Sequence, residues 1–414
     1  MRLPTRLPRI RQIAVFVVMP MLLLAGLVFS LAGCQKQAQA EDRLPQLLDV
    51  IYVPGPSAMA MTPEGLLYVI NLGGMPGKSY IAVLDGPKLV ETIPWPNEKT
   101  FAGTSPMVFN AHNELLYVLD LLANQLYVLQ DTELIATMEV GYAPRAIAVD
   151  PDSGLVYIAN PITKPLHPDD KAGPGEVVIV EGTKIIHRIP LERPHKLTFS
   201  EFDKQMYVGQ SNPFGKGAQK ILVAIDDRTF MTQTIYPADY GGGIQNIVVN
   251  PNNGHVYLTR DDFGLLMYWD RNIFYRIDVG SMGYSINTIA VDSRKNWLYA
   301  ASWDGPPSHV VVIEEDKVVA EIPVGYDVRA VAVDETHDYV YAANYRSDTL
   351  SVIRGTEVIT TLVTGGLGPW DIAVDEKRGY IYVTNGNSAS VAVFGFDEAD
   401  TPSFWQRYFP FIQR

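Results

Sequence analysis

Short apolar runs of three or four residues, separated by turn residues, follow one another from residue 50 to residue 396. In the last copy, residues 372–374, 381–383 and 391–393 are apolar, and the segments between them are rich in Gly, Asn, Asp and Ser. Such short runs, rich in β-branched and aromatic residues, predict strands, because a helix would need a longer run with a 3.6-residue period. The pattern therefore predicts an all-β chain.

The same unit occurs eight times, and every copy carries a tyrosine in its second predicted strand. These residues are Tyr68, Tyr117, Tyr157, Tyr207, Tyr257, Tyr299, Tyr341 and Tyr382. Successive tyrosines lie 40–50 residues apart, a period that is typical of a β-propeller blade when each unit holds several short strands. We therefore predict an eight-bladed β-propeller with four antiparallel strands per blade. Seven blades with one degenerate unit is the alternative.

The two ends of the repeated region complement each other. The eighth unit has no good fourth strand after Phe394, and residues 50–53 have the pattern of an outer strand without a blade of their own. We expect this N-terminal strand to complete the last blade and to close the ring. Closure removes two open strand edges, which would otherwise favour aggregation.

The first forty residues differ from the repeats. Four arginines precede an apolar run over residues 13–31, and Cys34 follows two small residues. This resembles a lipoprotein signal peptide, whose cysteine thiol accepts a lipid. A transmembrane anchor is the alternative, since 19 residues can span a bilayer, but Pro20 and the small residues favour the signal peptide. The expected organisation is signal peptide 1–33, flexible tether 34–46, propeller 47–396 and aromatic tail 397–414.

Cys34 is the only cysteine, which excludes an intramolecular disulfide, a Cys-x-x-Cys-His haem site and a cysteine-based zinc cluster. Removal of residues 1–33 leaves 29 of the 33 Lys and Arg against 46 Asp and Glu, a net charge of −17. Such a surface repels phosphate backbones, so no nucleic-acid partner is expected. Lipid on Cys34 predicts attachment to a membrane of the cell envelope on its extracytoplasmic side, and Gln35 permits the outer membrane.

The eighth second strand, Ile-Tyr-Val-Thr-Asn over residues 381–385, resembles the YVTN-family β-propeller repeat, and residues 67–71, 156–160 and 340–344 are close variants. The resemblance covers residues 50–396. It implies a secreted or envelope-anchored propeller without a single activity, since such propellers serve as binding scaffolds, surface-layer proteins or redox-enzyme subunits. Four copies depart from the family pattern at the Asn position, where they have Asp120, Gln210, Arg260 and Ser302.

Two classes of connection vary in length, namely those from second to third strand and those from outer strand to the next inner strand. Residues 161–175 and 96–105 are examples, whereas the other turns are uniformly short. Both variable classes belong to one rim of a propeller. That rim is the expected binding face, because loops diverge there without disturbing the core.

One polar or aromatic position recurs at the rim-facing start of each inner strand. It holds Ser57, Ser105, Arg145, His195, Gln245, Asn287, Arg329 and Trp370. We take Arg145, His195, Gln245, Asn287, Arg329 and Trp370 as candidate ligand-binding residues at the mouth of the channel. Two arginines suit a carboxylate or phosphate, and a tryptophan suits a ring. Strand starts near water are also polar in general, and this plainer interpretation is favoured.

Other motifs give no catalytic residue, metal ligand or cofactor. The seven histidines lack paired spacing, and Asp261-Asp262 lies outside any calcium-loop motif, so a solvated turn is the better interpretation. Five aromatic residues lie in the tail over residues 401–414. We expect them to pack on the propeller wall, with insertion among lipid headgroups as the alternative.

These observations predict a non-enzymatic binding or scaffold lipoprotein that uses its variable rim for a protein, glycan or small ligand. The competing hypothesis is a redox or hydrolytic propeller enzyme, or a subunit of one.

Overall fold

The computed structural model describes residues 43–72, 79–95, 106–163, 175–211, 222–235, 243–260, 266–279, 286–303 and 305–396. Nearly all of them belong to one compact unit, Gln46–Gly395. These residues form strands and turns, and none of them belongs to a helix long and apolar enough to cross a membrane. Cys34, Ser105, Asp261, Asp262 and the tail 397–414 lie outside the described residues.

The compact unit is built from four-stranded antiparallel sheets. Blade 1 comprises β2 (Pro56–Met61), β3 (Leu66–Asn71), β4 (Tyr80–Asp85) and β5 (Lys88–Pro94). Blade 2 comprises β6 (Met107–Asn110), β7 (Leu115–Asp120), β8 (Gln125–Gln130) and β9 (Glu133–Glu139). Blade 3 comprises β10 (Ala146–Val149), β11 (Val156–Asn160), β12 (Gly175–Glu181) and β13 (Lys184–Leu191). Blade 4 comprises β14 (Pro194–Ser200), β15 (Gln205–Gln210), β16 (Leu222–Asp226) and β17 (Thr232–Ile235).

The second half of the unit repeats this arrangement. Blade 5 comprises β18 (Ile244–Val249), β19 (Val256–Arg260), β20 (Leu266–Trp269) and β21 (Phe274–Ile277). Blade 6 comprises β22 (Ile286–Asp292), β23 (Trp297–Ser302), β24 (His309–Glu314) and β25 (Lys317–Pro323). Blade 7 comprises β26 (Val328–Asp334), β27 (Tyr339–Asn344), β28 (Thr349–Arg354) and β29 (Glu357–Val363). Blade 8 comprises β30 (Pro369–Asp375), β31 (Tyr380–Asn385), β32 (Ser390–Phe396) and β1 (Pro45–Tyr52).

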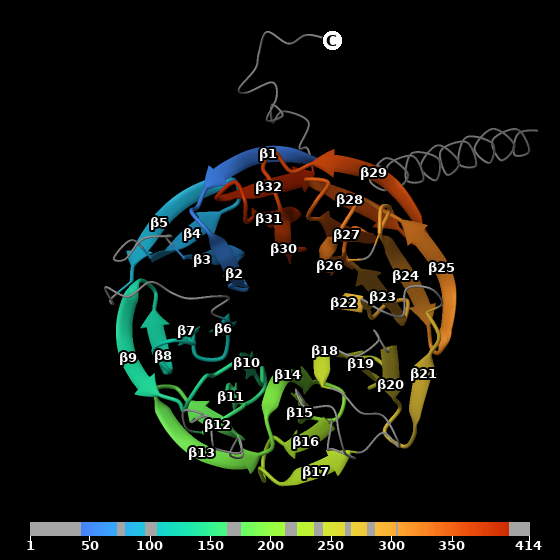
Figure 1. Cartoon of the computed structure of the whole chain (residues 1–414). Helices are drawn as coiled ribbons and strands as arrows, with labels where there is room; N and C mark the ends of the chain where they lie inside the picture. The colour runs from blue at the N-terminus through green and yellow to red at the C-terminus, as the bar shows by residue number, and fades with distance from the viewer. Residues whose placement is uncertain are drawn as a thin grey trace, which may run out of the picture. The chain divides into compact units, whose positions relative to one another are not determined.

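The ring closes through the N-terminal strand. The sheet of blade 8 has the order β1-β32-β31-β30, so β1 supplies the outer strand that the eighth repeat lacks. Inner strands of successive blades contact one another all around the ring, and β30 contacts β2 (Figure 1). The prediction of eight blades and of closure by an N-terminal strand is therefore confirmed, and seven blades is ruled out. Strand β1 begins at Pro45, so it includes the last residues of the expected tether.

Burial explains the strand pattern. Second strands are buried along their whole length, as all six residues of β7 and β27 show, because neighbouring blades cover both of their faces. Outer strands alternate between exposed and half-buried residues, as in β29, because one face meets water. The core is therefore divided into layers between blades rather than gathered at one centre.

The recurrent tyrosines lie in these layers. Tyr299 packs against Val331 and Ala342 of the next blade, and its hydroxyl donates to the carbonyl of Gly355 at 3.2 Å. The hydroxyl of Tyr117 likewise donates to the carbonyl of Gly182 in blade 3 at 3.0 Å. Burial raises the pKa of both tyrosine hydroxyls above the usual value. The prediction that this tyrosine packs between blades is confirmed.

The asparagine that ends the repeat motif is structural as well. Asn344 and Asn385 are fully buried, and each lies beneath a glycine of the preceding connection. A Cβ on Gly325 would come within 2.6 Å of Asn344, and one on Gly366 within 2.5 Å of Asn385. The four residues that replace Asn in other copies are also buried. The position is therefore a packing position whatever residue occupies it.

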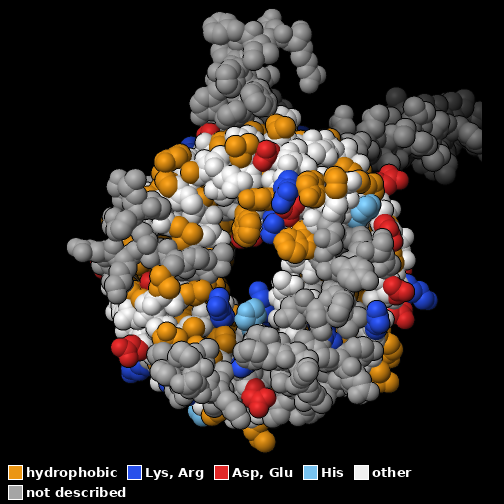
Figure 2. All heavy atoms as spheres, in the orientation of Figure 1, with side chains coloured by type: hydrophobic (Ala, Val, Ile, Leu, Met, Phe, Trp, Pro, Cys, Tyr) orange, Lys and Arg blue, Asp and Glu red, His pale blue; other side chains and the backbone are white. Residues whose placement is uncertain are grey.

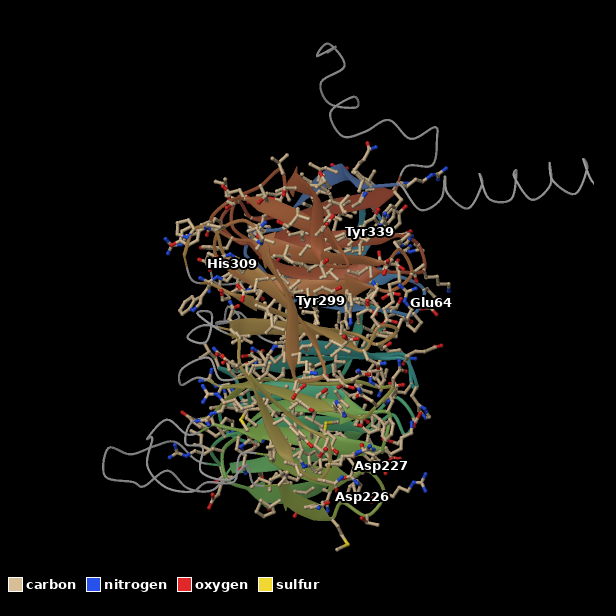
Figure 3. All side chains as sticks on the ribbon, turned by 90° about the vertical axis from the view of Figure 1, so that its right-hand side faces the viewer. Glu64, Asp226, Asp227, Tyr299, His309 and Tyr339 are labelled. Atoms are coloured by element: carbon tan, nitrogen blue, oxygen red, sulfur yellow. The ribbon has the colours of Figure 1, made fainter. Side chains whose placement is uncertain are left out.

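The connections fall on two faces. Inner strands start at the face of the variable connections, which we call the loop face, and they end at the face of the short turns, which we call the turn face. Figure 3 shows the ring from its side, with His309 toward the loop face and Glu64 toward the turn face. Each candidate site below belongs to one of these two faces.

Candidate functional site on the loop face

The recurrent rim position coincides with a β-bulge. The register between inner and second strand shifts at this point in blades 1, 4, 5, 6, 7 and 8, for example between Val328 and Ala330 and between Pro369 and Asp371. A bulge leaves one residue unpaired and redirects its side chain. The bulge therefore explains why Arg329 and Trp370 are turned out of their sheets at the loop face.

Arg329 and Trp370 come together. The guanidinium carbon of Arg329 lies 5.0 Å from the ring centroid of Trp370, and it also lies 5.3 Å from that of Trp303 and 5.1 Å from that of Tyr345. Three rings from three blades thus surround one cation at cation–π distance. Trp303 is 49% exposed and Trp370 is 39% exposed, so the outer edges of these rings face water.

A buried carboxylate compensates part of the charge. The side chain of Asp327 is 3% exposed and pairs with two arginines, Nε of Arg329 at 2.8 Å and Nε of Arg346 at 3.1 Å. Two arginines and one aspartate leave the group with a net charge of +1. This charge lies near the surface, because the Arg346 side chain is 59% exposed. We call these six residues the aromatic–arginine patch: Trp303, Asp327, Arg329, Tyr345, Arg346 and Trp370.

Backbone contacts fix the patch in place. The N–H of Asp327 donates to Oγ of Ser308 at 3.0 Å, and its carbonyl accepts the N–H of Tyr345 at 2.9 Å. The Tyr345 ring meets Trp370 edge-on at 5.7 Å, and its hydroxyl exchanges hydrogen bonds with the amide of Asn387. The Tyr345 ring is therefore held in place, with Trp370 packed against it, before any ligand arrives. Figure 2 shows hydrophobic, basic and acidic side chains together beside the central opening, near β26 and β30.

Asp371, which follows Trp370, is a perturbed acid beside the patch. One carboxylate oxygen accepts the N–H of Ile372 at 2.9 Å, and the residue is half-buried. Burial raises the pKa of the Asp371 carboxyl to about 6, against the stabilising effect of that hydrogen bond. Its charge therefore changes in a mildly acidic range.

The structure does not gather the other candidates at the patch. The amide of Asn287 donates to the carbonyl of Val328 at 2.9 Å, so it connects blade 6 to blade 7 beside Arg329. Gln245 and Arg145 are exposed and His195 is half-buried. Arg145 belongs to blade 3, four blades from Arg329 in the ring. The sequence suggested a pair of arginines around one anion, whereas Arg329 already pairs with Asp327; an anion at Arg145 stays a prediction.

Sequence reasoning missed four members of the patch: Trp303, Asp327, Tyr345 and Arg346. Their signal was present, because Trp303 and Tyr345 directly follow second strands and therefore end at the same face as Trp370. Only the first position of inner strands was compared along the repeats. A comparison of the first residue after each second strand would have found both rings.

We searched the described residues for side chains that could hold a metal ion together. No three His, Cys, Asp or Glu side chains among these residues come together in a way that would hold a metal ion.

Comparison with solved structures places the fold among known propellers. The propeller of Dos1 matches with a TM-score of 0.64 at 11% identity, over 85% of this chain and 95% of that chain. Sqt1 of Chaetomium thermophilum matches with 0.64 at 12%, over 85% and 98%, and the C-terminal WD40 domain of Sif2 with 0.63 at 10%, over 86% and 99%. The chain has the β-propeller fold of these structures. No protein-family model and no curated protein matches its sequence. At such low identity, the likeness concerns the fold alone.

Proposed function

We propose that this protein is a lipid-anchored, non-enzymatic scaffold of the cell envelope that docks a partner protein on its aromatic–arginine patch. The single observation that carries the proposal is the exposed cluster of Trp303, Tyr345 and Trp370 around Arg329. The propeller fold and its WD40-like neighbours agree with a binding role.

The composition of the patch favours a protein partner. Tryptophan, tyrosine and arginine are the residues that dominate the binding energy of protein interfaces. Here Asp327 holds the two arginines and Asn387 holds the hydroxyl of Tyr345, so binding costs these side chains little entropy. Leu367 lies on the connection that leads into β30, three residues before Trp370, and is 54% exposed, which adds apolar area. Exposed aromatic groups of this kind mark interaction surfaces.

A glycan or a small ligand is the competing occupant of the same rim. A sugar would stack on a free ring face and would need several hydrogen-bonding groups around that ring. At the patch, the carboxylate of Asp327 is buried under two arginines, and one face of Trp370 is covered by Arg329. Because Asp327 is already paired and one face of Trp370 is already covered, the patch suits a partner protein better than a glycan.

The anchoring and family parts of the proposal are supported by the sequence. The basic, apolar and small-residue segments before Cys34 have the order of a lipoprotein signal peptide. The strand motif over residues 381–385 agrees with a YVTN-type propeller outside the cytoplasm. Incorporation of labelled palmitate into the wild type but not into Cys34→Ser would support the anchor, and equal labelling would contradict it.

Site-specific crosslinking in native cells tests the docking surface. A photoreactive phenylalanine analogue at Leu367 should give one defined adduct, and a double variant Trp303→Ala/Trp370→Ala should abolish it. The matched control is the same analogue at Met231, which is 72% exposed and lies in blade 4. Each alanine should weaken the purified complex by about 2 kcal/mol, as is usual for central interface aromatics.

Two results would contradict the proposal. One is an adduct at Leu367 that persists in the double variant. The other is saturable binding of an oligosaccharide that depends on Trp370, which would assign the patch to a glycan.

A further inference from the structure

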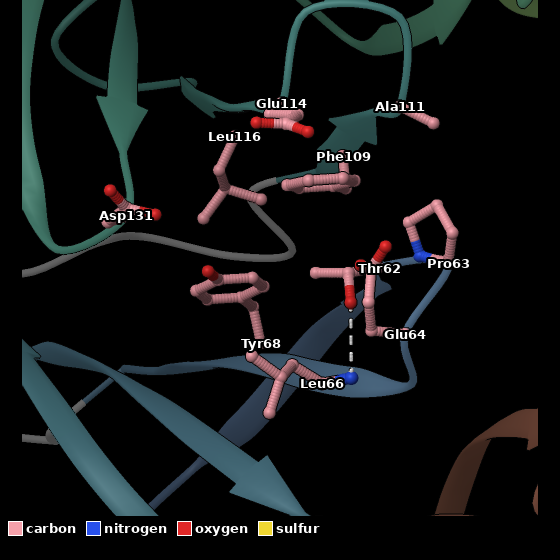
Figure 4. A pocket seen from close by; sticks show the side chains of 10 residues that line it. All are labelled: Thr62, Pro63, Glu64, Leu66, Tyr68, Phe109, Ala111, Glu114, Leu116 and Asp131. Atoms are coloured by element: carbon pink, nitrogen blue, oxygen red, sulfur yellow. Dashed lines mark hydrogen bonds between the residues drawn. The ribbon is translucent and has the colours of Figure 1, made fainter.

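A second site lies on the turn face, between blades 1 and 2. It is a pocket with a volume of about 280 Å³. Tyr68 of β3 and Phe109 of β6 form its inner wall, with ring centroids 6.4 Å apart and planes inclined by 12°. Leu116 of β7 completes the apolar part, and Figure 4 shows the three side chains facing the cavity. The volume lies just below the usual range for drug-sized ligands, about 300–1,000 Å³, so the pocket suits a single side chain.

Three exposed carboxylates border the cavity: Glu64, Glu114 and Asp131. Each belongs to a short turn, and they come from both blades (Figure 4). Within the described parts of the chain, no lysine or arginine pairs with any of them. The carboxylates also affect the aromatic wall of the pocket. The pKa of the Tyr68 hydroxyl is raised by burial and, to a smaller extent, by the negative charges of Asp131 and Glu91. The pocket therefore combines apolar rings with uncompensated negative charge.

The other seams of the ring are bridged on this face. Their contacts are Asn110 to Gly154, Lys204 to Asp152, Arg271 to the Phe202 ring, Asn250 to Asn296, Arg294 to Asp338, Thr336 to Glu376 and Arg378 to Asp85. At the seam between blades 1 and 2, no hydrogen bond or ion pair joins the described turns 62–65 and 110–114. Three of these bridges are made by arginines of the chain itself, Arg271 on an aromatic ring and Arg294 and Arg378 on carboxylates. Among its described residues, the seam between blades 1 and 2 has the rings and the carboxylates on this face but no cation that bridges the two blades.

We propose that this pocket binds a lysine or arginine side chain presented by a partner polypeptide. The apolar stem of such a side chain would lie against Tyr68, Phe109 and Leu116, and its charged end would reach the three carboxylates. Rings attract a cation at their faces, and carboxylates add charge pairing. The chain itself makes a contact of this kind at the seam between blades 4 and 5, where the guanidinium carbon of Arg271 lies 4.2 Å from the Phe202 ring centroid. This site is independent of the aromatic–arginine patch on the opposite face.

Short peptides with one variable side chain test the assignment. The full-length protein, labelled with ¹³C in its Tyr and Phe rings, is titrated with acetyl-Gly-Lys-Gly-amide, its arginine analogue and its norleucine analogue. We expect the cationic peptides to shift the Tyr68 and Phe109 signals saturably, with a Kd on the order of 1 mM, and we expect the norleucine peptide to bind at least tenfold more weakly. Salt should weaken the cationic peptides, because exposed charges are screened.

Charge-neutral variants locate the effect. The double variant Glu114→Gln/Asp131→Asn should weaken the lysine peptide tenfold or more. Glu133→Gln is the matched control, because Glu133 is exposed and begins β9 two residues after Asp131 without lining the pocket; it should change the affinity less than twofold. Circular dichroism verifies that each variant is folded.

Four outcomes overturn the proposal: no saturable shift in the wild type, equal binding of the norleucine peptide, unchanged affinity in the double variant, or equally strong binding of free butylammonium. The last result would assign the pocket to small amines rather than to polypeptides.

Discussion

Arg329 and Asp371 both lie next to Trp370, the first against its ring and the second one residue further along the chain. Their surroundings determine whether the charge of each side chain depends on pH. Arg329 is held by rings on three sides and by a buried carboxylate, so it is a fixed part of a surface rather than a mobile charge. Asp371 has little compensation, and burial raises its pKa. The starts of two neighbouring inner strands, β26 and β30, therefore carry one charge that is constant and one that depends on pH.

The stability of the protein should depend on pH through Asp371. In the unfolded chain the Asp371 carboxyl has the ordinary pKa of 3.8, whereas burial in the folded protein raises this pKa to about 6. Between these values the folded state binds more protons, so the free energy of unfolding falls as pH rises through this window and is level above it. The loss is at most about 3 kcal/mol at 1.36 kcal/mol for each pH unit.

Asp371→Asn should remove this dependence. Urea unfolding of the wild type and the variant from pH 3.5 to pH 7 measures it as the difference between the two curves, in which other carboxylates cancel. Asp316→Asn, an exposed turn residue, is the control. Parallel curves for the wild type and Asp371→Asn would contradict the prediction.

At the scale of elements, one side chain makes the polar contacts at the turn face of the seam between blades 8 and 1, above a buried apolar cluster that both blades share. Arg378 lies in the turn after β30, and its guanidinium pairs with Asp375 at 2.5 Å and with Asp85 of blade 1 at 2.6 Å. It also donates to the carbonyl of Gly65. These contacts raise the pKa of the guanidinium, although desolvation alone would lower it. Arg378 therefore joins the last blade to the first at the turn face, while β1 completes the sheet of blade 8.

Arg378→Ala should lower the free energy of unfolding by about 2–3 kcal/mol, because the buried carboxylate of Asp375 loses its partner. Denaturant titration monitored by tryptophan fluorescence measures the change. Arg294→Ala is the matched control, since its ion pair with Asp338 is about half exposed on both sides, and such pairs contribute roughly 0–1 kcal/mol. Equal effects of the two substitutions would show that the seam does not depend on Arg378.

The repeats predicted the strands but not the pocket on the turn face. Apolar runs and turn residues predict each strand, because burial between blades demands them at every copy. The pocket on the turn face was missed because all turns there are short. Its signal was Phe109, which stands where five copies have valine. The other two copies have Met61 and Phe199 at this position, so the size of the residue alone did not single out the seam between blades 1 and 2.

At the scale of the whole molecule, eight blades and their closure were predicted from the sequence, since eight copies of the repeat, a spare strand at one end and a missing strand at the other favoured this arrangement over seven blades. The patch did not follow. Trp303, Arg329 and Trp370 are separated by up to 67 residues, and only the stacking of three blades brings them together. Periodicity predicts which face a residue occupies, whereas contacts across blades depend on side-chain directions that the bulges set.

Removal of β1 should open the ring. A chain that begins at residue 54 leaves the edge of β32 unpaired, and exposed edges promote association. We expect it to elute as oligomers in size-exclusion chromatography, whereas a chain that begins at residue 43 should be no more associated than the protein without its first 33 residues. A monodisperse chain from residue 54 with unchanged thermal stability would contradict this.

Closure by β1 also imposes an order in time. The strand is synthesised first, but its partner β32 begins only at Ser390. At about 5–20 residues per second, the ribosome needs roughly 20–70 s to produce that partner. Throughout this interval the first strand waits without its sheet while seven blades are completed behind it. The last step of biogenesis therefore joins the oldest and the newest parts of the chain.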